Sequence, residues 1–224
     1  MERTKNRVLV KGLVSSKVAF FYGIMLGFIG AGILYFKTNH LTFIIGLIGL
    51  FVYVIVYSLW MKRCSVYGTL IGSISGSVPP VVGYCAATNN FDIGAILLFL
   101  ILTLWQMPHS YAIAIYRLED YKKAGIPVLP LKNGILNAKI HMLVYIVFFV
   151  FATLMLTFMS YTGVVYFAVV FVLGLRWLWI SIKGFKTLDN RLWARQMFLF
   201  SIIIITASSF MMAVDFIPFT GNMV

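Results

Sequence analysis

The sequence predicts an all-α fold, a polytopic membrane helix bundle with about seven transmembrane helices. Hydrophobic residues make up 62% of the chain, charged residues only 11%, and the mean hydropathy is +0.98. A soluble domain averages about 45–50% apolar and about 25% charged residues, so the bilayer must solvate much of this chain. The apolar residues also gather into long runs, with the basic residues between them. An open strand edge cannot pair its backbone groups in lipid, so we expect the runs to be helices.

Each apolar run is long enough to cross the hydrocarbon core, which takes about 17–25 helical residues. The runs are Val18–Phe36, Leu41–Trp60, Thr69–Ala87, Ile93–Tyr116, Met142–Ser160, Gly163–Ile182 and Met197–Val214. We expect residues 1–224 to form a single membrane domain.

Small residues and prolines distinguish the third run. Gly68, Gly72 and Gly76 recur every four residues, a spacing that lets helices approach closely in lipid. Pro79 and Pro80 follow in mid-span and remove two backbone donors, which predicts a kink or an opening of the helix.

Lysine and arginine are distributed very unequally over the connections. Nearly all of them lie before the first run or after the second, fourth and sixth runs, whereas Lys37 alone lies on the opposite side. The positive-inside rule therefore places the N-terminus in the cytoplasm and the C-terminus in the periplasm. This topology accounts for the net charge of +12, so the charge does not indicate nucleic-acid binding.

Polar residues follow one face of the fourth run. Gln106, His109, Ser110, Arg117 and Asp120 share a broad helical face, and Gln106 to Arg117 spans about 16 Å of helix rise. Ionisable groups at membrane depth are costly unless they meet a partner or a wet cavity. We interpret the stripe as the lining of a pocket that opens at the cytoplasmic surface, although a single histidine of this kind is often structural.

The mouth of this stripe combines acids and bases. Glu119 and Asp120 offer the hard oxygen ligands that Mg²⁺ prefers, and Arg117, Lys122 and Lys123 could hold phosphate oxygens. The alternative is a solvated loop that is basic only because it faces the cytoplasm.

Further cations are expected near this mouth or on the route to it. One cluster, Arg3, Lys5 and Arg7, precedes the first run, and Lys62 with Arg63 follows the second. Arg176 lies within the sixth run, where it either extends toward the headgroups or pairs with an anionic ligand.

Four segments together resemble the heme O synthase (protoheme IX farnesyltransferase) family of the UbiA-like intramembrane prenyltransferase superfamily. They are Met1–Arg7, Leu59–Arg63, Trp105–His109 and Tyr116–Pro130. The resemblance covers essentially the whole chain, and the Trp-Gln-x-Pro-His motif is specific to the heme branch. It implies a nine-helix bundle around a lipid-open cavity and farnesyl transfer from farnesyl diphosphate to a vinyl group of heme b.

The resemblance also implies roles for individual residues. Glu119 and Asp120 would hold Mg²⁺ at a catalytic centre that includes Lys62. Other substrate-binding residues would hold diphosphate or meet heme b, with His109 as the candidate axial ligand: Arg3, Arg7, Gln106, Arg117, Lys122, Lys123 and Arg176. The implied location is the bacterial inner membrane, where heme-copper oxidase assembly or heme A synthase would be the partners.

The sequence departs from the family pattern at its start. The first acidic motif and two helices of the family have no counterpart here, so we expect Met1 to be an internal methionine and the 224-residue chain to be unable to complete the reaction. Two other functions stay open: a prenyltransferase for an aromatic acid or quinol, and a membrane protein without enzymatic activity, such as a heme-handling chaperone or an inactive fragment. A transporter is less favoured, because paired broken helices in two inverted repeats are not evident.

Overall fold

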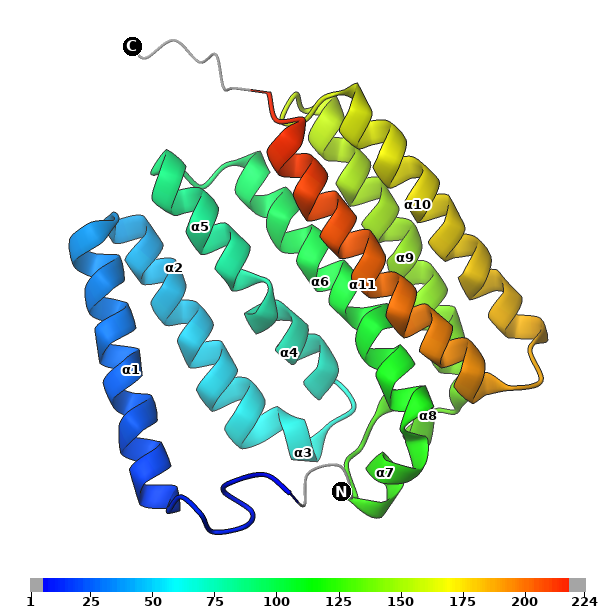
Figure 1. Ribbon diagram of the computed structural model, residues 1–224, viewed down its shortest axis with the longest axis horizontal. Helices are drawn as coiled ribbons and strands as arrows, with labels where there is room; N and C mark the ends of the chain where they lie inside the picture. The colour runs from blue at the N-terminus through cyan, green and yellow to red at the C-terminus, as the bar shows by residue number, and fades with distance from the viewer. Residues whose placement is uncertain (1–5, 218–224) are drawn as a thin grey trace.

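A computed structural model describes residues 6–217, apart from the Arg63 side chain. Seven helical spans, each long and apolar enough to cross a membrane, run up and down beside one another (Figure 1). The predicted all-α membrane bundle is therefore confirmed. Its helical elements are α1 (Ser16–Lys37), α2 (His40–Phe51), η2 (Val52–Met61), α3 (Lys62–Cys64), α4 (Gly68–Gly76), α5 (Val78–Thr88), α6 (Ile93–Tyr116), α7 (Leu118–Lys123), α8 (Leu129–Lys132), α9 (Ile135–Phe158), α10 (Val164–Lys183), η3 (Gly184–Lys186) and α11 (Asn190–Val214).

The spans define two ends of the bundle, which differ in charge. The basic end carries the segment before α1, α3, the α7–α8 connection and the α10–α11 turn (Figure 1). The far end carries the α1–α2, α5–α6 and α9–α10 turns together with Asp215–Ile217. Nearly all the lysines and arginines of the connections fall at the basic end.

The tightly packed part of the bundle is formed by α6, α9, α10 and α11. Its core contains the fully buried Trp177, Tyr166, Phe149 and Met142. In contrast, α1 contains no buried residue and packs along α2. Its large apolar side chains are exposed, as expected for a helix that lies against lipid.

The third span is interrupted in mid-membrane, as the prolines predicted. Helix α4 ends at Gly76 and α5 begins at Val78, so the two halves meet at Ser77. Gly49 of α2 packs directly on Val78, where a Cβ would lie 2.6 Å from a Val78 methyl group. Helix α2 therefore packs directly against the first residue of α5, next to the break.

The second span changes its winding near the basic end. Here α2 continues as the π-helix η2, a conformation that hydropathy does not reveal. Tyr57 of η2 packs over Gly72, where an added Cβ would lie 2.9 Å from the ring. Gly72 thus allows the close helix contact that its spacing predicted.

Two helices begin earlier than the apolar runs indicated. Helix α9 starts at Ile135 rather than Met142 because Lys139 is buried and its ammonium donates to the Gly184 carbonyl over 2.6 Å. Helix α11 starts at Asn190 rather than Met197, capped by the Asp189 carboxylate, so its first turns carry charged residues.

Candidate functional site

Gln106 lies on α6 and faces the break in the third span. Its amide nitrogen donates to the Ser73 carbonyl (3.3 Å), the Ser77 hydroxyl (3.2 Å) and the Leu102 carbonyl (3.1 Å). Gly76 leaves room for it, because a Cβ at that position would overlap the Gln106 amide. Gln106 therefore joins α6 to α4 and to Ser77 at the break.

His109 lies one turn farther along α6 and faces α11. Its Nδ1 lies 2.7 Å from the Ser201 hydroxyl, and its ring stacks on Trp105 with centroids 4.7 Å apart. Ser201 donates its single hydroxyl proton to the Phe198 carbonyl over 2.6 Å, so it can only accept from His109. The proton of the neutral imidazole is thus assigned to Nδ1, and Nε2 keeps its lone pair for a ligand.

The basic end of α6 holds two guanidinium groups over one aromatic ring. Arg117 lies 4.8 Å and Arg191 5.4 Å from the centroid of Tyr116. Arg117 also meets the Asp120 carboxylate at 4.0 Å. Both guanidinium groups lie near one ring because α11 packs on α6, with Arg191 near the start of α11 and Tyr116 at the end of α6.

A cavity of about 320 Å³ opens beside these residues, and we call it the basic-end pocket. It is lined by Ile115, Tyr116, Arg117, Leu118, Glu119, Asp120, Ile135, Asn190 and Arg191. The Asn190 side-chain oxygen is buried and has no hydrogen-bond partner among the described residues. Oxygen ligands for a metal and cations for an anion thus share one small cavity.

The donor set suits Mg²⁺ but is incomplete for tight binding. Glu119 and Asp120 are the carboxylates in the pocket, and no group of three or more His, Cys, Asp or Glu side chains in metal-binding proximity occurs among the described residues. Mg²⁺ is usually held by one or two carboxylates while substrate phosphates and water supply its other oxygens. These residues therefore fit a metal that arrives with a diphosphate.

The predicted site residues separate into three groups. Arg117, Glu119 and Asp120 line the basic-end pocket, whereas Gln106 and His109 lie deeper on α6 and face different neighbours. Lys62 lies apart from both, with its ammonium 5.6 Å from the centroid of Tyr57 on η2. Four other predicted cations are not among the residues that line that pocket: Arg7, Lys122 and Lys123, which are exposed, and Arg176, whose guanidinium lies 4.2 Å from the Trp179 centroid. Arg3 falls outside the described residues.

Sequence reasoning missed the contribution of α11 to this pocket. Asn190 and Arg191 follow Asp120 by about seventy positions and belong to a connection that looked like an ordinary basic turn. Only the packing of α11 on α6 brings them to the two acids.

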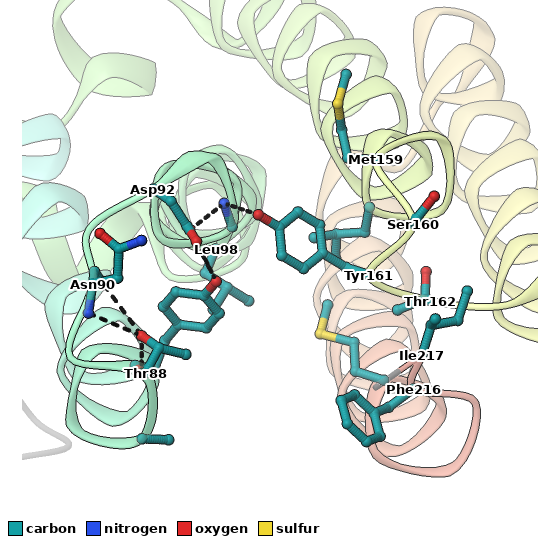
Figure 2. Close-up of a pocket in the computed structure, with 15 residues that line it drawn as sticks. Thr88, Asn90, Asp92, Leu98, Met159, Ser160, Tyr161, Thr162, Phe216 and Ile217 are labelled. Atoms are coloured by element: carbon teal, nitrogen blue, oxygen red, sulfur yellow. Dashed lines mark hydrogen bonds between the residues drawn. The ribbon is translucent and has the colours of Figure 1, made fainter. Parts of the chain in front are cut away.

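A larger cavity of about 800 Å³ lies at the far end, and we call it the far-end pocket (Figure 2). Asp92 caps α6 there by accepting from the Gly94 (2.8 Å) and Ala95 (3.3 Å) amides, and the Tyr84 hydroxyl donates to both of its carboxylate oxygens at 2.9 Å. Figure 2 shows Tyr161 reaching across from the α9–α10 turn to accept from Gly94 at 3.0 Å. Apart from these groups the walls are largely apolar.

The arrangement of spans and acids can be compared with known proteins. The family model described as the UbiA prenyltransferase family matches residues 1–203. The chain belongs to the UbiA prenyltransferase family.

Individual relatives within this family are close in sequence. The chain is 55% identical over 216 residues to protoheme IX farnesyltransferase from Pseudomonas syringae pv. syringae and 56% identical to that from Shigella sonnei. Each alignment covers 96% of this chain and 73% of the relative. A solved structure described as digeranylgeranylglyceryl phosphate synthase shares the fold, with a TM-score of 0.76 at 19% identity, over 96% of this chain and 76% of the other.

Proposed function

We propose that this protein transfers the farnesyl group of farnesyl diphosphate to a vinyl group of heme b, giving heme O. The observation that carries the proposal is the 55–56% identity to protoheme IX farnesyltransferases over 96% of the chain. The aligned 216 residues include the segments that contain His109 and Asp120.

The hydrogen bonding of His109 supports a contact with heme. Axial histidines commonly bind iron through one ring nitrogen while the other donates to a fixed oxygen. Here Ser201 holds Nδ1 and Trp105 stacks on the ring, so the free Nε2 is the nitrogen available to heme iron. Trp105 is fixed in turn, since its indole donates to the Ser201 carbonyl over 2.7 Å.

The basic-end pocket supports diphosphate departure. Mg²⁺ bound with the diphosphate would neutralise the charge that develops as the bond between C1 of farnesyl and oxygen breaks. Glu119 and Asp120 would hold the ion, and Arg117 would bind phosphate oxygens. We assign the neighbouring exposed cations Lys62, Lys122 and Lys123 to capture of the incoming diphosphate, with Arg3 and Arg7 on the N-terminal segment.

The chemistry then needs protection from water. Diphosphate leaves with the bonding electron pair, the vinyl π-bond of heme attacks C1, and water adds to the resulting cation on the porphyrin side chain with loss of a proton. The apolar interior beside α6 keeps other water away from the allylic cation. Gln106 would hold α4 and the break at Ser77 against α6.

The charge asymmetry supports a cytoplasmic location for the basic end and a periplasmic location for Asp215–Val224, in a bacterial inner membrane. The product would serve heme-copper oxidase assembly, directly or through heme A synthase. In a Cys64→Ala background, which removes the exposed native thiol, a cysteine placed at Lys123 should react with a reagent supplied from the cytoplasm. Labelling from the periplasm would contradict the orientation.

A reconstituted assay tests the function. The purified chain in lipid nanodiscs is incubated with heme b, farnesyl diphosphate and Mg²⁺, and the porphyrin product is identified by mass spectrometry. Heme O is the expected product if the proposed function is right, with an aromatic acid and a quinol as competing acceptors. Its formation would also overturn the expectation, drawn from the absent first acidic motif, that the 224-residue chain cannot complete the reaction. Prenylation of a competing acceptor alone would indicate a different prenyltransferase, and heme binding without any transfer would indicate a heme-handling protein.

A further inference from the structure

Arg191 and Asn190 have no role in the reaction as described so far. Both line the basic-end pocket, together with the acids on α7. No carboxylate forms an ion pair with Arg191 within residues 6–217, and Arg117 has only the Asp120 contact at 4.0 Å. The guanidinium groups of Arg117 and Arg191 thus both lie near the Tyr116 ring, and only Arg117 is paired with a carboxylate, that of Asp120.

Arg191 is exposed and Arg117 partly so, which screens the repulsion between them, and a bound anion would lower it further. Two guanidinium groups can bind several phosphate oxygens at once, because each presents a planar set of donors. The Tyr116 ring restrains both groups, so less side-chain freedom would be lost when the anion binds.

Asn190 contributes the opposite kind of group. Its buried amide oxygen lacks a partner among the described residues, and a buried acceptor without a hydrogen bond costs free energy. Amide oxygens are ligands for hard cations and accept hydrogen bonds from metal-bound water. Glu119 and Asp120 line the same cavity of about 320 Å³, so all three oxygen donors border one small volume.

We propose that the first turn of α11 forms the facing half of the metal–diphosphate site, with Arg191 binding diphosphate oxygens beside Arg117 and Asn190 supplying an oxygen to the metal or to its water. The inference rests on the proposed function, which it deepens by assigning two residues of a helix distant in sequence. A diphosphate held in this way bridges α6 and α11 at their basic ends.

Calorimetric titration of the purified chain with inorganic pyrophosphate tests the anion half, with and without Mg²⁺. Arg191→Gln should weaken pyrophosphate binding about tenfold or more, since a charge-assisted contact is lost. Arg191→Lys should recover part of the affinity. Arg195→Gln is the matched control: it removes an equal charge from an exposed position on the same helix and should leave binding unchanged. Equal losses in the two glutamine variants would overturn the assignment in favour of bulk charge.

The metal half is tested by the same titration in two Asn190 variants. Asn190→Leu should reduce the factor by which Mg²⁺ strengthens pyrophosphate binding, and Asn190→Asp should preserve or increase it. A change in melting temperature with no change in that factor would assign Asn190 to folding alone and refute this half.

A heme titration separates this inference from the proposed function. Arg191→Gln should leave heme affinity unchanged. If the variant instead loses affinity for heme alone, Arg191 pairs with a heme propionate carboxylate, and its role in diphosphate binding is refuted. Arg191-dependent pyrophosphate binding in a chain that does not prenylate heme would sustain the inference while the proposed function failed.

Discussion

At the far end of the bundle, Asp92 accepts hydrogen bonds from the Tyr84 hydroxyl and two backbone amides, whereas at the basic end Asp120 meets a single guanidinium at 4.0 Å. The far-end pocket is also the larger, at about 800 Å³ against about 320 Å³. Its polar groups are largely bonded to one another, while the basic-end pocket contains an acceptor without a partner. The unpaired Asn190 oxygen and the two guanidinium groups, rather than cavity size, are therefore the reasons for proposing the charged ligand at the basic end.

This comparison predicts the largest effect for Asp120→Asn. The substitution removes a metal-binding charge that contributes little to folding, so Mg²⁺-dependent turnover should fall by about 100- to 1,000-fold. The melting temperature should stay close to that of the unmodified chain. Turnover is measured by product formation in nanodiscs, and a variant that melts early instead would place Asp120 among the structural acids.

His109→Ala tests a residue that lies between the two ends of the bundle. One of its ring nitrogens, Nδ1, is hydrogen-bonded to Ser201, and we propose that the other, Nε2, binds iron. If Nε2 binds iron, heme affinity should fall at least about tenfold and the Soret band should shift. Ser201→Ala is the companion variant, since it removes only the partner of Nδ1 and should produce a smaller change. An unaltered spectrum in folded His109→Ala protein would return this histidine to a packing role.

Asp92→Ala tests the far end. It removes the cap of α6 and leaves the Tyr84 hydroxyl unpaired, so the free energy of unfolding should fall by about 1–3 kcal/mol. Turnover per folded molecule should be unchanged. Asp92→Asn keeps a capping oxygen and should lose less stability. The comparison of the two ends would break down if Asp92→Ala proved stable but inactive.

The smallest effect is expected for Lys62→Ala. Its ammonium is exposed and lies over Tyr57, so removal should raise the apparent KM for farnesyl diphosphate only a few-fold through weaker electrostatic attraction. Raising the ionic strength should reduce the difference. Lys37→Ala, at the far end, is the matched control and should leave KM as it is. Equal effects of the two variants would show that Lys62 acts only through the net charge.

Much of the fold was predictable because the bilayer restricts spanning segments to long apolar helices. The fourth span, Ile93–Tyr116, was predicted with the bounds that the structure has. The starts of α9 and α11 were missed because Lys139, Arg191 and Arg195 looked like loop residues. Burial of an ammonium against the end of another helix is a tertiary arrangement that hydropathy cannot indicate.

The candidate site was predictable only where it is local in sequence. Arg117, Glu119 and Asp120 are at most three residues apart in the sequence, so they stay close although α6 ends at Tyr116 and α7 begins at Leu118. The separate orientations of Gln106 and His109 depend on which helices pack on α6, and the contribution of Asn190 and Arg191 depends on the antiparallel pairing of α6 with α11. A periodic pattern contains no information about such neighbours.

The break at Ser77 has a consequence for insertion of the chain into the bilayer. A helix that starts within the hydrocarbon core leaves its first four amide groups without intrahelical acceptors, and each costs several kcal/mol in lipid. Pro79 and Pro80 stand in the first turn of α5 and have no amide hydrogen, so two of these donors do not exist. An interrupted span with this sequence should therefore partition into the membrane at a lower cost than one broken by glycine or serine.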